Sequence, residues 1–327
     1  MSTVSGNVYC TIFDGGYLAS ALALRQSLLD ASPHARAALV CTDPAALEVL
    51  RAMRLPRTAL VPYEAIATAE LDRMRGERSR GEFSWTLKPY ALLHLAREFP
   101  DSAWLVYVDA DMMFFGDPDL ALPQGGPHYV ITPHRFHPSF AHHARTAGLH
   151  NAGYVAMRGT PEGARAIEWW RDRCLESCSA VPTVDTYADQ LYLDRMSELF
   201  PYGESSAHPG LNAAPWNIEN YAVSGGDGEV RLDGASLLLY HFQSLRVLNS
   251  WLIDLYAGDR RLPPAVRDLV YQPYLARLGA AWRALREVSG ARAAPVPSRL
   301  HSPLDWLRLA RGVMQGRHNL LLRRIAS

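Results

Sequence analysis

The sequence lacks an excess of charge of either sign, because 33 lysine and arginine residues balance 33 aspartate and glutamate residues. A neutral chain does not have the charge pattern typical of a nucleic-acid-binding protein, so any polyanionic ligand must be bound by a few local groups. No apolar run approaches the ~18 residues that a membrane-spanning helix needs, and the first seven residues show no cationic start followed by an apolar segment. We therefore expect a cytoplasmic protein.

Cysteine and lysine are both scarce. Cys174 and Cys178 lie one helical turn apart without a second ligand pair nearby, which argues against a zinc site, and the two other cysteines fall in predicted core strands. Lys88 is the only lysine of the chain. A lysine in a chain that otherwise uses arginine indicates a need for a compact, flexible ammonium, such as a point charge on a phosphate or a hydroxyl.

Two nucleotide-binding signatures are also missing. The first predicted strand is not followed by Gly-x-Gly-x-x-Gly, and the chain has no phosphate loop that ends in Gly-Lys-Ser/Thr. If the protein binds a nucleotide, its phosphates must therefore be held by a metal ion and by side chains.

The most informative segment that is present is an apolar strand that runs into two carboxylates. Residues 105–108 are apolar, and Asp109-Ala110-Asp111 follows directly. Residues i and i+2 of an extended chain point to the same side, so Asp109 and Asp111 can converge on one hard divalent cation. Without a cation, two neighbouring carboxylates would repel each other.

The order of the predicted elements is an alternation of strands and helices. Apolar runs predict strands over the residues 8–13, 37–42, 58–62, 104–108, 129–132 and 154–157, with 236–242 closing the sheet. Helical spacing predicts helices over the residues 85–97, 160–178 and 185–196, and a polar connection over 72–82. This pattern favours an α/β fold with a mixed, mainly parallel sheet flanked by helices, whose functional loops follow the strand ends.

Three parts are predicted along the chain. Residues 1–250 form the α/β domain, and residues 251–290 form a helical extension packed on it. A linker and a basic amphipathic helix follow in residues 291–327, where apolar residues alternate with arginines. Such a helix favours peripheral contact with an anionic lipid surface, with packing on its own domain as the alternative.

Over residues 7–250 the chain resembles the GT-A nucleotide-sugar glycosyltransferases, most closely glycosyltransferase family 8 (the glycogenin and galactosyltransferase-like group) and its bacterial branch. In this resemblance Asp109 and Asp111 are the Asp-x-Asp metal motif, and His241 in Leu-Tyr-His-Phe is the third metal ligand. Two carboxylates and one imidazole suit Mn²⁺ and can accept Mg²⁺. The resemblance implies a UDP-sugar donor and transfer with retention of configuration.

The other family motifs supply further candidate site residues. Thr11, Asp14 and Tyr17 match the uridine-binding turn of the family. Lys88 matches a lysine that faces the donor phosphates and sugar, and Ala110 matches the middle residue of the metal motif. Asn151 and Gly153 match the Asn-x-Gly turn at the transferred sugar, and Asp189 and Gln190 match an Asp-Gln pair near the anomeric carbon. Ser244 stands where the family has glycine, and only Arg246 can replace a later family lysine.

The acceptor side is less defined. The rigid, aromatic segment 208–217 is expected to line the acceptor side of the site, with Trp216 either stacking on a sugar or filling the core. Four histidines between 128 and 150, His134, His137, His142 and His143, are expected in solvated loops, with acceptor contact as the alternative. The acceptor can be a carbohydrate, a lipid-linked oligosaccharide or a protein.

Two other classes of function fit part of the pattern. A strand followed by Asp-x-Asp also resembles the nucleophile motif of haloacid-dehalogenase-like phosphatases, in which Asp109 would attack phosphate. That motif normally begins its fold and needs a later lysine, whereas Lys88 precedes Asp109. A non-catalytic module that binds a sugar nucleotide would carry the same ligand motifs as the enzyme.

Overall fold

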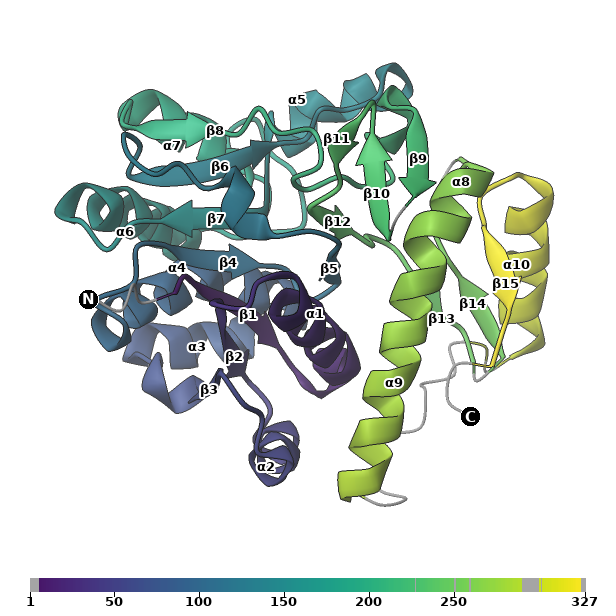
Figure 1. Cartoon of the computed structure of the whole chain (residues 1–327), viewed down its shortest axis with the longest axis horizontal. Helices are drawn as coiled ribbons and strands as arrows, with labels where there is room; N and C mark the ends of the chain where they lie inside the picture. Colours follow the sequence, from purple (N-terminus) through teal and green to yellow (C-terminus); the bar gives the residue numbers. More distant parts are fainter. Residues whose placement is uncertain are drawn as a thin grey trace.

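A central sheet of seven strands organises the structure, a computed structural model that describes residues 6–226, 228–249, 251–258, 260–289, 300 and 302–324. The strand order is β3-β2-β1-β4-β7-β6-β8 (Figure 1). The strands are β1 (Val8–Phe13), β2 (Arg36–Cys41), β3 (Thr58–Pro62), β4 (Leu105–Val108), β6 (Tyr129–Pro133), β7 (His150–Met157) and β8 (Gly203–Ser205). β7 runs antiparallel to both of its neighbours and the other pairs are parallel, which confirms the expected mixed, mainly parallel sheet.

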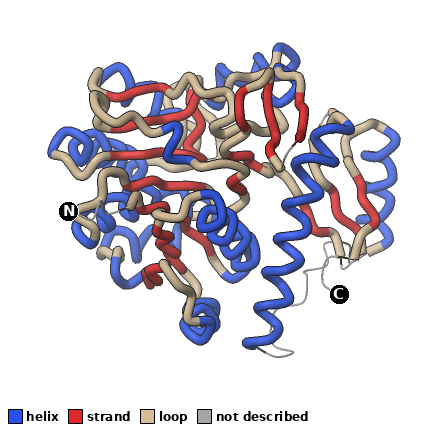
Figure 2. The backbone as a smooth tube through the Cα atoms, in the orientation of Figure 1, coloured by secondary structure: helices blue, strands red, loops and turns tan. Residues whose placement is uncertain are grey.

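Helices cover both faces of this sheet (Figure 2). On one face lie α4 (Arg80–Glu98), α6 (Pro161–Glu176) and α7 (Leu191–Leu199), which share a hydrophobic core with β1, β4 and β7. On the other face, α1 (Leu18–Ala31) packs its leucines against the opposite sides of the same strands. Strands buried on both faces explain the continuous apolar runs from which they could be predicted.

Local capping signals explain where several helices begin. Asp43 accepts hydrogen bonds from the first backbone amides of α2 (Pro44–Met53), which has proline in its first turn. A capping box of Ser79 and Glu82 starts α4 five residues before the predicted residue 85.

One predicted connection and one predicted helix differ from the structure in their bounds. The predicted polar connection over 72–82 instead covers the end of α3 (Ala69–Glu77), which Thr68 caps, and the first residues of α4. The helix predicted over 185–196 begins only at Leu191, because residues 185–190 form the loop that carries Asp189 and Gln190.

The segment 236–242 was predicted to close the main sheet, and this is wrong. Its strand β12 (Leu239–His241) pairs antiparallel with β5 (Met112–Phe114) in a separate two-stranded sheet. A three-stranded antiparallel sheet of β9 (Val223–Gly226), β10 (Glu229–Leu232) and β11 (Ala235–Ser236) precedes β12. Short 3-10 helices lie at Gly15–Tyr17, Tyr63–Ala65, Pro118–Ala121, Pro138–His143 and Ile218–Asn220, and α5 spans Ala144–Ala147.

The C-terminal region combines helices with strands that the sequence did not reveal. A short α8 (Pro264–Val266), a π-helical turn (Arg267–Tyr271) and α9 (Gln272–Ser289) form a long rod beside α1 (Figure 1). Beyond it, β13 (Arg246–Val247), β14 (Leu252–Asp254) and β15 (Leu320–Leu322) form a sheet beside α10 (Pro303–Met314). The predicted amphipathic helix corresponds to α10 and ends at Met314. Most of the predicted linker, residues 290–299 and 301, lies outside the described residues.

Candidate active site

The Asp109-Ala110-Asp111 motif forms a tight turn between β4 and β5. The Met112 amide donates to the Asp109 carbonyl over 3.2 Å, so the chain reverses directly after the motif. Pairing of β5 with β12 places His241 opposite Met112, and the Phe242 amide donates to the Asp111 carbonyl over 2.8 Å. Residues that are 130 positions apart are therefore held together by a backbone ladder, as the resemblance implied for His241.

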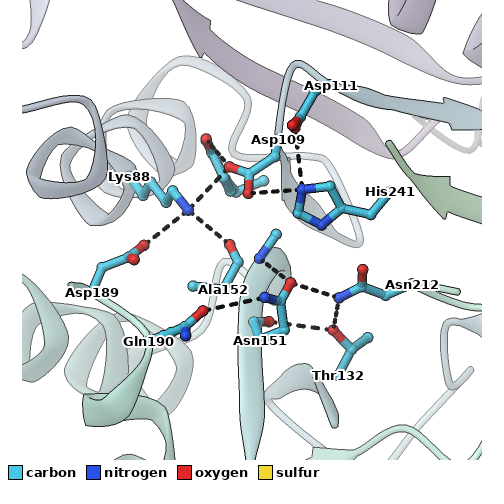
Figure 3. A network of polar contacts seen from close by, with 12 residues as sticks. Lys88, Asp109, Asp111, Thr132, Asn151, Ala152, Asp189, Gln190, Asn212 and His241 are labelled. Atoms are coloured by element: carbon cyan, nitrogen blue, oxygen red, sulfur yellow. Dashed lines mark hydrogen bonds and ion pairs between the residues drawn. The ribbon is translucent and has the colours of Figure 1, made fainter. Parts of the chain in front are cut away.

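Asp109, Asp111 and His241 form a candidate metal centre. Each offers a ligand atom within 4.8 Å of the others. His241 Nε2 lies 3.2 Å from Asp111 Oδ1 and 4.0 Å from Asp109 Oδ2 (Figure 3). Burial lowers the pKa of His241, but the carboxylate of Asp111 outweighs it, so the net pKa is raised.

This donor set fits a divalent cation. Carboxylate oxygens are hard ligands and imidazole is borderline, a combination that Mn²⁺ and Mg²⁺ accept. The cation would also neutralise the repulsion between two carboxylates that share one turn. Three protein ligands leave coordination positions for oxygens of a ligand.

Lys88 is buried beneath this centre, where the resemblance predicted an ammonium facing the donor phosphates. Its Nζ lies 3.0 Å from Asp109 Oδ1 and 2.9 Å from Asp189 Oδ2, and it donates to the Ala152 carbonyl over 3.1 Å. Burial lowers the pKa of Lys88, but the two carboxylates outweigh it and raise the net value. Lys88 therefore joins Asp109 to Asp189 through two ion pairs and binds the Ala152 carbonyl by a hydrogen bond.

The Asn-x-Gly turn lies at the start of β7, next to the Asp-Gln pair. Asn151 Nδ2 donates to Gln190 Oε1 over 3.2 Å, and Asn151 Oδ1 accepts from the Gly153 amide over 3.0 Å. A Cβ at Gly153 would lie 2.7 Å from Asn151 Oδ1 and 3.0 Å from His241 Nδ1, so only glycine fits without displacing both side chains. The structure therefore brings Lys88, Asp189, Gln190 and Asn151 to the candidate metal centre (Figure 3). Gly153 lies there too, beside the His241 ring.

The predicted nucleotide-binding residues lie in and directly after β1, at the edge of the sheet where Asp109 follows β4. Thr11 is buried, and its hydroxyl has no hydrogen-bond partner among the described residues. Asp14 accepts from the Gly16 amide over 2.9 Å and caps the turn, whereas Tyr17 is 51 % exposed and can offer a ring face to a base.

The remaining predicted donor-binding residues lie in the metal motif and just after His241. Ala110 is buried between the two acids. Ser244 has a φ of +64°, a conformation that favours glycine, which matches the family residue expected there. Arg246 is exposed and belongs to β13 of the C-terminal sheet, so the structure shows no contact of its side chain with the metal centre among the described residues.

The histidines of residues 134–143 differ in their environments. His142 and His143 are exposed as expected, but His134 is buried, which corrects its assignment to a solvated loop. Trp216 is buried beside it, donates from Nε1 to the His134 carbonyl over 3.0 Å, and packs edge-on against His241 at 5.2 Å between ring centroids. Trp216 therefore fills the core and packs against a candidate metal ligand.

Sequence reasoning did not identify three polar contacts of the site. The Tyr107 hydroxyl donates to Asp109 Oδ1 over 2.8 Å. Asn212 Nδ2 donates to Asn151 Oδ1 over 2.9 Å and to Thr132 Oγ1 over 2.7 Å. Tyr107 lies in an apolar strand and Asn212 in a loop, and no local pattern signals either contact.

Solved structures provide a comparison for this fold. The galactosyltransferase LgtC, in complex with donor and acceptor sugar analogues, superposes with a TM-score of 0.52 at 15 % identity over 84 % of this chain and 95 % of its own. The chain therefore has the GT-A glycosyltransferase fold, a mainly parallel sheet between helices with an acidic cluster after a central strand.

The sequence comparison defines the family. The uncharacterized protein YfnF of Bacillus subtilis (strain 168) is 31 % identical over 281 residues, which cover 82 % of this chain and 91 % of YfnF. YfnD of the same organism, also uncharacterized, is 30 % identical over 73 % of this chain and 78 % of its own. The chain belongs to the family of YfnF and YfnD. No family model matches it.

Proposed function

We propose that this protein is a metal-dependent glycosyltransferase that moves a hexose from a UDP-sugar to a hydroxyl acceptor in glycan or envelope polysaccharide synthesis. The observation that carries the proposal is the convergence of Asp109, Asp111 and His241 within 4.8 Å on a GT-A fold, next to Asn151 and Gln190. LgtC, which shares the fold, is a galactosyltransferase that binds donor and acceptor sugar analogues.

Charge development at the leaving group explains the use of this site. Transfer breaks the bond between the anomeric carbon and the diphosphate oxygen, and the electron pair of that bond remains on the diphosphate. A bound Mn²⁺ or Mg²⁺ supplies positive charge to those oxygens and stabilises the transition state more than the ground state. Asp109, Asp111 and His241 would hold the cation, and Asn151 and Gln190 would offer amide groups to the sugar.

The environment of Asp189 favours an ion-pair route with retention of configuration. A covalent route would need an accessible carboxylate beside the anomeric carbon. Asp189 is buried at 2 % exposure, and its Oδ2 is paired with Lys88 at 2.9 Å. In the ion-pair route the acceptor oxygen bonds to the anomeric carbon, and its proton passes to the departing diphosphate, with Asp189 and Lys88 positioning the surrounding groups.

The alternative classes make different predictions. Asp109 follows β4, the fourth strand along the chain, whereas the phosphatase motif begins its fold. The lysine that pairs with it, Lys88, precedes it in the sequence, whereas that motif needs a later lysine. Loss of phosphomonoester hydrolysis on Asp109→Asn would favour that class. A non-catalytic module would bind UDP-sugar with Mn²⁺ and release no UDP.

A nucleotide panel tests the class and the base together. We expect UDP with Mn²⁺ to raise the melting temperature by mass action, while ADP, GDP or UDP with chelator leaves it unchanged. UDP release from UDP-hexoses should then require Mn²⁺ or Mg²⁺. Equal shifts by all nucleotides would contradict the uridine assignment, and the absence of any shift or turnover would contradict the proposed function.

We also propose that the protein acts in the cytoplasm, with peripheral membrane contact through its C-terminal region. Among the described helices none has the length and apolarity for a membrane crossing. Leu304, Trp306, Leu307 and Met314 of α10 are nevertheless 53 %, 49 %, 66 % and 82 % exposed, and Arg308 is exposed on the same helix. Apolar and cationic side chains on one surface helix suit an anionic lipid surface, and such a location suits a lipid-linked acceptor.

Vesicle flotation tests this contact with the full chain. We expect co-flotation with vesicles that contain anionic phosphatidylglycerol, weaker co-flotation with phosphatidylcholine alone, and a severalfold loss for Leu304→Ser/Leu307→Ser. Leu120→Ser/Leu149→Ser is the matched control, because these leucines are 73 % and 63 % exposed elsewhere in the chain. Equal flotation of both double variants would contradict the assignment to α10.

A further inference from the structure

We infer that Asn212 is a positioning residue for sugar transfer, which fixes the side-chain amide of Asn151 and, through it, the amide of Gln190. The inference rests on the proposed function, in which the two amides face the transferred sugar. Asn212 lies in the loop that follows β8, far in sequence from both residues, and the three side chains form one hydrogen-bonded chain (Figure 3).

An asparagine amide can adopt two orientations of the same shape, and only its partners decide between them. Asn151 Oδ1 accepts from the Gly153 amide over 3.0 Å and from Asn212 Nδ2 over 2.9 Å. After a flip, the NH₂ group of Asn151 would face two donors. The Nδ2 group of Asn212 is itself fixed, because it also donates to Thr132 Oγ1 over 2.7 Å.

The other end of the Asn151 amide reaches Gln190. Asn151 Nδ2 donates to Gln190 Oε1 over 3.2 Å and lies 3.3 Å from His134 Nε2. Burial lowers the pKa of His134 to about 3, so its imidazole is neutral and Nε2 can accept a hydrogen bond. With its carbonyl held by Asn151, Gln190 presents its amide NH₂ group to the substrate.

The loop of Asn212 is built to hold this residue in place. Trp216 Nε1 and Asn217 Nδ2 both donate to the His134 carbonyl, over 3.0 and 2.8 Å. Asn212 is 1 % exposed with a φ of +60°, a conformation that asparagine tolerates better than most residues. Its Oδ1 is buried without a hydrogen-bond partner among the described residues. A buried oxygen without a hydrogen-bond partner destabilises the fold. The benefit of an asparagine at this position therefore comes from the hydrogen bonds of its NH₂ group and not from packing.

Two substitutions separate the donor group from the backbone conformation. Asn212→Gly removes the side chain and still tolerates a positive φ. Asn212→Asp keeps the shape but turns an oxygen toward Asn151 Oδ1, which favours the flipped amide. Asn220→Gly and Asn220→Asp are matched controls, because Asn220 is exposed eight residues further on and its side-chain amide donates to the Arg135 carbonyl, away from Asn151.

Steady-state kinetics with a UDP-hexose, together with calorimetric titration of UDP and Mn²⁺, tests the inference. Since a small misplacement of a reacting group costs up to roughly 100-fold, we expect kcat to fall roughly 10-fold in Asn212→Gly and roughly 100-fold in Asn212→Asp. The affinity for UDP with Mn²⁺ should change less than about twofold, because UDP carries no sugar for these amides. Both Asn220 variants should match the wild type.

A double variant tests whether Asn212 acts through Asn151. In Asn151→Ala, the further change Asn212→Gly should alter kcat less than about twofold, because the group that Asn212 orients is already absent. Full additivity of the two losses would overturn the inference, as would wild-type kcat in both Asn212 variants. The proposed function fails separately, if the wild-type protein releases no UDP from any UDP-hexose.

Discussion

Asp111→Asn is expected to abolish metal-dependent sugar transfer while leaving the fold intact. The substitution keeps the shape of the side chain and its contact with His241 Nε2, now 3.2 Å from Asp111 Oδ1, but removes one of the two charges proposed to hold the cation. Loss of about 4 kcal/mol of transition-state stabilisation corresponds to about 1,000-fold in kcat/KM. Assays of UDP release with and without Mn²⁺ measure the loss of kcat/KM. The Mn²⁺-dependent rise of the melting temperature measures the loss of cation binding.

Asp111 is preferred to Asp109 for this experiment because Asp109 also binds Lys88 and Tyr107. We expect the free energy of unfolding without metal to change by at most about 1 kcal/mol. Asp101→Asn is the control, since it removes the same charge from an exposed position. Wild-type turnover and an unchanged Mn²⁺ response in Asp111→Asn would exclude this cluster as the metal centre.

The main elements of the fold could be predicted because their signals are local. β1, β2 and β4 are buried on both faces and read as apolar runs, and the caps of α2 and α6 are visible as short motifs. The partner of β12 could not be predicted in this way. An apolar run shows that a strand is buried but does not state which strand it pairs with, and β12 pairs with β5 across the metal site.

The candidate site likewise contains residues that local motifs predict and contacts that no local motif predicts. Asp109, Asp111, Asn151, Asp189 and His241 stand in motifs, and the structure brings them together. The contacts of Tyr107 and Asn212 depend on the spacing of distant segments, and no motif records them. His134 shows a further limit, because its ring packs not only against its loop neighbour Phe136 but also against Trp216, which comes from a distant segment.

Lys88→Met is expected to destabilise the fold and to abolish turnover together. Methionine fills a similar volume without charge, and Asp189, 2 % exposed, would be left beside Asp109 with no cation. Removal of one partner of a buried ion pair costs about 3–5 kcal/mol. With about 2.1 cal/mol/K of unfolding entropy per residue, a chain of 327 residues should lose roughly 4–7 °C in melting temperature.

Double-mutant analysis separates the ion pair from the loss of packing. Asp189→Asn should destabilise less than Lys88→Met, because Lys88 retains Asp109 and the Ala152 carbonyl. Lys88→Met/Asp189→Asn should be more stable than the sum of the single changes by about 1–3 kcal/mol, since the neutral amide needs no counterion. Arg97→Met, at an exposed position of the same helix, is the control. Additive single changes, or a Lys88→Met variant that melts with the wild type, would show that Lys88 does not hold the two carboxylates together.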